Sequence, residues 1–202
     1  MAQDKPGTAG LARAQLARAA ARFGRAGLPA LVLMTDDERL PDPVAVARRL
    51  PRGSLIVVRA RKHARREALA RALKALTRAK GYKFVVADDP GLAARIGADG
   101  IHLTEARAKE AAHWRARRSR WLITAAAHSL RACRAGCDAV LLSPVFATAS
   151  HPGAPALGAM RARLIARQSP VAVLALGGID ARTVRRLAGG AFAGVAAIGA
   201  LA

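Results

Sequence analysis

Short apolar runs rich in Val, Ile and Leu recur along the chain at intervals of roughly two dozen residues. The runs are continuous rather than alternating, which is typical of strands buried on both faces, as in a parallel sheet. Segments of helical period lie between them, among them residues 43–50, 65–80, 130–137 and 181–187. The eight runs comprise residues 30–35, 54–59, 83–88, 100–104, 121–126, 139–143, 171–176 and 192–198.

The interval between these runs is the length of one βα unit. Eight such units in 202 residues predict an α/β fold made of a single (β/α)8 TIM barrel. A doubly wound open sheet is the alternative, but it leaves some of the runs without a place. We divide the chain into an N-terminal helical extension, residues 1–28, with a helix over 10–25, and a barrel domain, residues 29–202. The last helix of the barrel is expected to be short or missing.

The formal charge of +21 and a pI near 11.8 suggest nucleic acid or an anionic membrane as partner. However, the 34 basic residues are spread along the whole chain, and only seven residues, two Trp, one Tyr and four Phe, are aromatic. Stacking of unpaired bases needs an aromatic platform, which this composition does not supply. We therefore expect no nucleic-acid partner and no membrane partner.

The two cysteines, Cys133 and Cys137, have a spacing that is typical of neither a zinc site nor a redox motif. We expect free thiols in a reducing cytoplasm. The polar start of the chain does not resemble a signal peptide, and the apolar stretch over 187–202 is too short and too rich in Gly to span a bilayer. These features predict a cytoplasmic protein.

Glycine turns follow the last two predicted strands, where barrels of this kind bind phosphate. Gly177 and Gly178 follow the seventh run, Ile198 ends the eighth, and Gly199 follows it. Glycine lets bare backbone N–H groups approach an anion closely. Arg59, which ends the second run, has a forked guanidinium that can bind a phosphate through two hydrogen bonds. The sequence thus predicts an anion site at the carboxyl ends of the strands.

Four segments in chain order resemble the thiamine phosphate synthase/TenI family: residues 97–103 (GADGIHL), 143–148 (SPVFAT), 176–179 (LGGI) and 194–198 (GVAAI). The resemblance implies a (β/α)8 barrel, a bound thiazole phosphate and a role in making thiamin. It also implies one of two reactions. The synthase couples the thiazole phosphate to a pyrimidine diphosphate with Mg²⁺, and the TenI branch tautomerises a thiazole carboxylate phosphate.

The synthase pattern is only partly retained. By resemblance, Asp88 is a metal ligand if the chain is a synthase, but the position of the second carboxylate is Arg107. Mg²⁺ that holds a diphosphate prefers two hard carboxylates, and Arg carries the opposite charge. The positions implied to bind substrate or phosphate are Arg59, Arg61, Ser129, Thr148, Ser150, His151, Gly177, Gly178, Ile198 and Gly199.

His128, with Ser129 beside it, matches the position of the proton-transferring residue of the TenI branch. An imidazole that titrates near neutrality can take and return a proton. We favour a thiazole tautomerase-like proton transfer by His128 without a metal cofactor. The alternatives are the synthase reaction, with Mg²⁺ as cofactor and release of diphosphate, and a non-catalytic phosphate-binding homologue. The substrate is a small molecule in either reaction, and homo-oligomerisation stays open.

Overall fold

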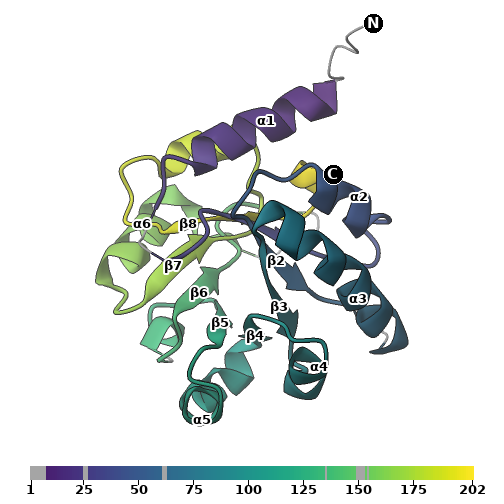
Figure 1. Ribbon diagram of the computed structural model, residues 1–202. Coiled ribbons are helices and arrows are strands. Elements are labelled where there is room, and N and C mark those ends of the chain that lie inside the picture. Colours follow the sequence, from purple (N-terminus) through teal and green to yellow (C-terminus); the bar gives the residue numbers. More distant parts are fainter. Residues whose placement is uncertain (1–7, 25–26, 61–62, 135, 149–152, 154) are drawn as a thin grey trace, which may run out of the picture.

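A computed structural model of the protein describes residues 8–24, 27–60, 63–134, 136–148, 153 and 155–202. Eight parallel strands form one closed barrel in the order β1-β2-β3-β4-β5-β6-β7-β8 (Figure 1). The prediction of a (β/α)8 barrel is confirmed, and each predicted run overlaps one strand. The strands are β1 Leu31–Met34, β2 Leu55–Val58, β3 Lys83–Ala87, β4 Gly100–Leu103, β5 Leu122–Ala127, β6 Ala139–Leu142, β7 Ala172–Ala175 and β8 Gly194–Ala197.

Helices of very different length connect the strands. The α-helices are α1 Thr8–Ala20, α2 Pro43–Arg48, α3 His63–Lys80, α4 Pro90–Arg95, α5 Ala111–Arg117 and α6 Gly158–Gln168. The 3-10 helices are η1 Glu105–Glu110, η2 Ala132–Arg134, η3 Thr183–Leu187 and η4 Gly199–Leu201. Only η4 follows β8 in the described residues, as expected for a short last helix.

The segment over 130–137 was expected to be an amphipathic helix, and that prediction is wrong in the described part. It contains only the three residues of η2, because the connection between β5 and β6 is short. The Ser129 hydroxyl oxygen accepts the Ala132 N–H at 3.2 Å, and Gly136 has a φ of +69°. The segment over 181–187 likewise forms the 3-10 helix η3 rather than an α-helix.

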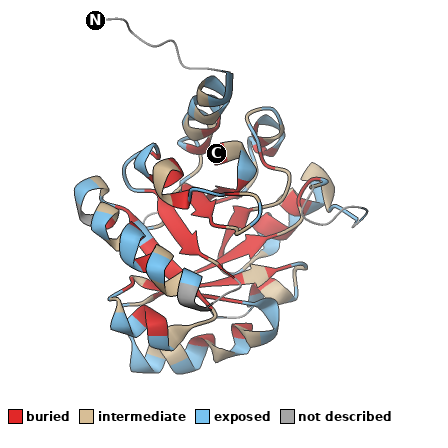
Figure 2. Cartoon of the chain, turned by 90° about the vertical axis from the view of Figure 1, so that its right-hand side faces the viewer, coloured by how far each residue is buried: buried red, intermediate tan, exposed pale blue. Residues whose placement is uncertain are grey.

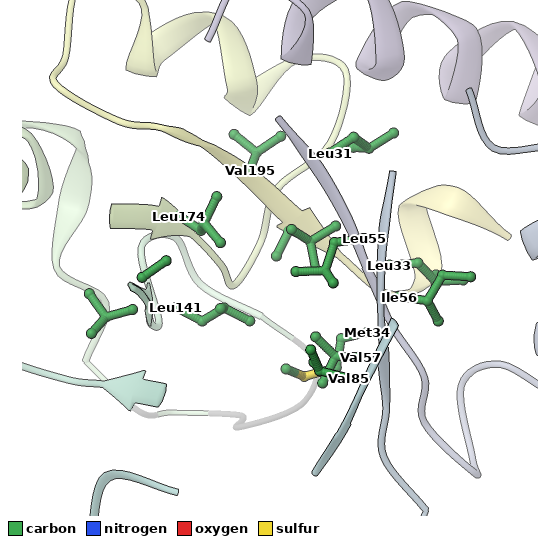
Figure 3. Packing of buried hydrophobic residues seen from close by; sticks show 14 of the residues in the cluster. Leu31, Leu33, Met34, Leu55, Ile56, Val57, Val85, Leu141, Leu174 and Val195 are labelled. Atoms are coloured by element: carbon green, nitrogen blue, oxygen red, sulfur yellow. The ribbon is translucent and has the colours of Figure 1, made fainter. Parts of the chain in front are cut away.

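The barrel strands are buried on both faces (Figure 2), which explains why their sequences are continuous apolar runs. Leu33 of β1 pairs in register with Ile56 of β2, and both are fully buried. Figure 3 shows these residues packing with others from β3, β6, β7 and β8. The interior is therefore a packed core, and chemistry is confined to the ends of the barrel.

The additional helix α1 packs against η3 and η4 through one apolar stripe. Leu16 and Ala20 are buried, whereas Leu11 on the same helix is 53% exposed. Both cysteines are free, as predicted, and both are buried. In the part of the chain that the structure describes, no helix is both long and apolar enough to cross a membrane.

Candidate functional site

Because all eight strands are parallel, their carboxyl ends meet at one rim of the barrel. The residues that directly follow the strands therefore lie around this rim, and most of the predicted site residues are among them. We call this end the carboxyl rim. The loops that follow β6, β7 and β8 form one half of it, and those that follow β1 to β5 form the other.

The glycine turn after β7 packs tightly against the loop that follows β6. Gly177 and Gly178 have φ angles of +93° and +62°. A Cβ at Gly178 would lie 2.4 Å from the Ala147 carbonyl oxygen, and one at Gly177 would lie 2.8 Å from Pro144 Cα. The Phe146 N–H donates to the Gly177 carbonyl at 3.0 Å. Only glycine fits this close approach of two loops.

Three backbone N–H groups at this part of the rim are bare. Within the described residues, the N–H groups of Gly177, Gly178 and Gly199 donate to no other residue. The turn is nevertheless held firmly, since the Thr183 hydroxyl donates to the Gly178 carbonyl at 2.8 Å. Bare N–H groups in a fixed turn are suited to an oxyanion such as phosphate. Ile198, immediately before Gly199, is buried.

Asp88 follows β3 in a left-handed conformation with a φ of +54°. The next residue, Asp89, begins α4 by accepting the Leu92 N–H at 2.8 Å, so the chain turns sharply between strand and helix. The Asp88 carboxylate oxygen Oδ1 accepts the Thr104 N–H at 3.0 Å. Asp88 is thus tied to the loop after β4 and is fixed at the rim.

Arg107 lies against this aspartate. Its Nη1 donates to the Asp88 carbonyl at 2.8 Å and lies 3.6 Å from Asp88 Oδ1. Its Nε and Nη2 each donate to the Glu110 carboxylate at 2.8 Å. Hydrogen bonds from Arg107 and from Trp114 lower the pKa of Glu110 to about 2, so this pair stays ionised at neutral pH.

The magnesium site implied by the resemblance does not fit these residues. Of the two positions that the resemblance gives to carboxylate ligands, Asp88 is acidic. The other is Arg107, whose guanidinium is positively charged. The Asp89 carboxylate caps α4. No group of three or more His, Cys, Asp or Glu side chains in the described residues could hold a metal ion.

Arg59 lies at the rim after β2, as predicted, and is held there by residues that follow β1. Its Nη2 lies 3.3 Å from Asp36 Oδ2, and its backbone N–H and carbonyl both hydrogen-bond the buried Thr35 hydroxyl. Burial raises the pKa of Asp36, but hydrogen bonds from Arg39 outweigh it, and the pKa lies below its usual value. Asp36 is therefore an ionised anchor for two arginines.

His128 lies directly after β5 with its side chain exposed. Its backbone N–H donates to Glu105 Oε2 at 2.8 Å, and its Nδ1 lies 2.6 Å from the Ser143 carbonyl oxygen. A carbonyl only accepts, so Nδ1 carries the proton in the neutral ring and Nε2 keeps its lone pair. This tautomer leaves one basic nitrogen for a substrate.

Ser129 and Thr148 occupy the same rim. Ser129 caps the η2 turn, so its hydroxyl has a local role and keeps its own proton for a further contact. Thr148 is half-buried at the end of the described part of the β6 loop. The predicted positions Arg61, Ser150 and His151 lie outside the described residues.

Other candidates from the sequence are structural. His102 is buried inside the barrel, with Nδ1 3.0 Å from the Thr124 hydroxyl oxygen. Asp99 accepts the Phe84 N–H at 2.9 Å at the amino end of the strands, opposite the rim.

Two rim residues were missed by the sequence analysis, Glu105 and Glu110. Glu110 could have been found from its i,i+3 spacing to Arg107, since such pairs meet on one helical face. Nothing in the sequence signals that Glu105 reaches across to the backbone of β5.

A cavity of about 1130 Å³ lies at the opposite end of the barrel, between the end of α1 and the loop before β8. Phe23, Phe192 and three arginines line it, and its described lining contains no acidic residue and no histidine. It therefore offers no group for proton transfer. We assign the chemistry to the carboxyl rim, where the bare N–H groups and His128 lie.

Comparison with known proteins identifies the family of this chain. The sequence model of the family described as "Thiamine monophosphate synthase" matches residues 31–201, which is the whole barrel. The chain belongs to the thiamine monophosphate synthase family. The family is enzymatic, and the resemblance seen in the sequence is confirmed.

Several members of the thiamine monophosphate synthase family are similar in sequence. Thiamine-phosphate synthase of Thermus thermophilus is 36% identical over 116 residues, which cover 56% of this chain and 56% of that protein. Thiamine-phosphate synthase of Geobacillus kaustophilus is 34% identical over 147 residues, covering 70% of this chain and 66% of that protein. The matched part thus spans little more than half of the Thermus relative.

Solved structures support the same fold. Thiamine phosphate pyrophosphorylase from Pyrococcus furiosus has a TM-score of 0.68 at 22% identity, covering 89% of this chain and 87% of that one. An aldolase from Escherichia coli K12 has a TM-score of 0.60 at 11% identity, covering 92% of this chain and 80% of that one. At these identities the likeness concerns the barrel fold alone.

Proposed function

We propose that this chain is a thiamine-phosphate synthase, which joins a thiazole phosphate to a hydroxymethylpyrimidine diphosphate and releases diphosphate. One observation carries the proposal: the backbone N–H groups of Gly177, Gly178 and Gly199 have no partner among the described residues, and they lie at the rim of a barrel whose named relatives are synthases. These groups bind the monophosphate of the thiazole.

The opposite half of the rim binds the second anion. Arg59 and Arg107 carry fixed positive charges after β2 and β4, and each is oriented by a carboxylate. Guanidinium groups hydrogen-bond phosphate oxygens through two parallel N–H groups, which orients the substrate as well as binding it. Two phosphorylated substrates on opposite halves of one rim bring their reacting ends together over the barrel mouth.

The proposal is tested by incubating the full chain with both substrates and measuring diphosphate release, with and without Mg²⁺. We expect release, and we expect Arg59→Gln to weaken pyrimidine diphosphate binding by about tenfold, the loss of one charged pair of hydrogen bonds. Arg95→Gln is the control, because Arg95 forms a similar ion pair with Glu67 at 3.4 Å but lies on α4 away from the rim. No release under either condition, and no heat on titration with thiazole phosphate, overturns the proposal.

The favoured prediction from the sequence, proton transfer by His128, is a second candidate. It is supported by the 2.6 Å contact from Nδ1 to the Ser143 carbonyl, which leaves Nε2 as the basic nitrogen. Incubation with the thiazole carboxylate phosphate tautomer tests it. His128→Gln should abolish conversion to the aromatic form, whereas His113→Gln, at an exposed position on α5, should not. A chain that binds thiazole phosphate but catalyses neither reaction is a non-catalytic homologue.

A further inference from the structure

The loop after β4 places a guanidinium where the synthase resemblance implies a divalent cation. Arg107 is held on two sides, by the Asp88 carbonyl at 2.8 Å and by both oxygens of Glu110 at 2.8 Å. Glu110 is itself fixed by the Trp114 ring N–H at 3.2 Å. The Arg107 side chain is 35% exposed, so this positioned charge still faces the rim.

The hydrogen bonds of Arg107 leave donors for a ligand. A guanidinium has five N–H groups, and the three contacts to Asp88 and Glu110 use three of them. The remaining two lie one on Nη1 and one on Nη2, and each can donate to an oxygen of an anion. The geometry thus suits an anion in direct contact with the arginine.

The same geometry is unfavourable for a divalent cation. A metal at Asp88 Oδ1 would lie beside the Arg107 Nη1, which is 3.6 Å from that oxygen, and the two positive charges would repel. Oδ1 is also the acceptor of the Thr104 N–H. Mg²⁺ needs near-ideal octahedral oxygen coordination, and the described residues contain no group of three or more His, Cys, Asp or Glu side chains that could hold it.

We propose that this site binds a diphosphate substrate without a divalent cation, with the Arg107 guanidinium supplying the positive charge in its place. The inference rests on the proposed function and specifies the electrostatics of that same site. Arg107 is a binding residue that contacts the diphosphate, and Asp88 and Glu110 position it.

Calorimetric titration of the full chain with inorganic pyrophosphate tests this, in one arm with excess EDTA and in the other with MgCl₂. We expect dissociation constants within about threefold of each other in the two arms, because the charge that binds is part of the protein. Arg107→Gln should weaken binding in EDTA by about tenfold. Arg107→Lys, which keeps the charge, should recover most of it.

The matched control is Arg115→Gln. The Arg115 side chain is 36% exposed and pairs with Asp138, so it resembles Arg107 in exposure and in its partner. It lies away from the rim, since Asp138 precedes β6, and its loss should change pyrophosphate affinity less than about twofold. Circular dichroism of each variant shows whether it is folded.

Arg107→Asp restores the second carboxylate and should make pyrophosphate binding depend on Mg²⁺ by about tenfold or more. Three results overturn the inference. The first is that the wild type binds pyrophosphate in the Mg²⁺ arm alone, and the second is that it binds in neither arm. The third is that Arg107→Gln leaves the binding unchanged. If diphosphate is released in the coupling assay in those cases, the proposed function stands without the inference. If pyrophosphate binds in EDTA but no coupling occurs, the inference stands and the proposed function is wrong.

Discussion

His102 lies inside the barrel, where its side chain is 6% exposed and contacts the Thr124 hydroxyl. Burial, and to a smaller extent the Arg59 charge, lowers the pKa of His102 to about 4 from 6.5. The folded protein therefore holds this ring neutral at pH values where the unfolded chain protonates it. Such a group links stability to pH.

The sign follows from the lowered pKa. The contribution of His102 to the free energy of unfolding is complete above pH 6.5. It falls as the pH is lowered towards 4, by about 1.4 kcal/mol per pH unit at most. Urea denaturation at pH 7, 6 and 5 measures the slope. His102→Gln should flatten it, and His113→Gln, at an exposed position, should leave it unchanged. A wild-type free energy of unfolding that does not vary over this range contradicts the prediction.

Of the two glycines in the turn after β7, Gly178 leaves less room for an added Cβ. Alanine there combines a φ of +62° with a Cβ 2.4 Å from the Ala147 carbonyl oxygen. We expect Gly178→Ala to cost about 2–4 kcal/mol in unfolding free energy, because backbone strain and a forced loop shift add together.

Gly189→Ala is the control for that change. Its φ of +74° imposes the same strain, but nothing lies within 4 Å of the added Cβ. Its cost should be about 1 kcal/mol, as measured by urea denaturation. Equal losses in the two variants would show that the loop contact contributes nothing.

Residue chemistry at the rim was partly predictable from the sequence. The glycine turns, Arg59 and His128 could be located because each follows a recognisable strand. The anchoring of Arg107 by Glu110 and the Asp88 carbonyl depends on how η1 brings Arg107 to the loop after β3, which no local pattern encodes. The left-handed Asp88 was equally invisible, because the aspartate side chain tolerates but does not require that conformation.

At the scale of the elements, α1 has only a weak apolar pattern in its sequence, and few of its side chains are buried against the barrel. Leu16 is fully buried against the barrel, and Leu11, on the same helix, is 53% exposed. Leu16→Ala should lower the free energy of unfolding by about 2–4 kcal/mol through the cavity it leaves. Leu11→Ala should change it by less than about 0.5 kcal/mol. Urea denaturation of both variants decides whether α1 is part of the cooperative unit.

The strands were predictable from the sequence because burial on both faces leaves a continuous apolar signal. The connections were less so. Residues 130–137 have the composition of an amphipathic helix, but the distance between β5 and β6 and the Ser129 cap limit them to one 3-10 turn. Tertiary geometry overrides helical propensity in such short connections.

At the scale of the whole molecule, positive charge is in excess, since the chain has 34 Lys and Arg residues and 13 Asp and Glu residues. Many of the carboxylates are already engaged in caps or ion pairs, as at Asp42, Asp89 and Glu110. Repulsion among the remaining positive charges therefore opposes the compact state.

Salt should relieve that repulsion. We expect the melting temperature to rise by about 2–4 °C, equivalent to about 1 kcal/mol, when NaCl is raised from low to moderate concentration. Scanning calorimetry at constant pH measures it. A melting temperature that falls with salt would mean that the ion pairs outweigh the net charge.

The ladder between β1 and β8 joins Leu31 to Val195 and closes the barrel. During synthesis, β1 can pair with β8 only after nearly the whole barrel has left the ribosome. Until then the nascent sheet has two open edges, which are templates for pairing with other chains. Slow translation ahead of β8 would therefore prolong an aggregation-prone state, whereas the mature barrel presents no sheet edge.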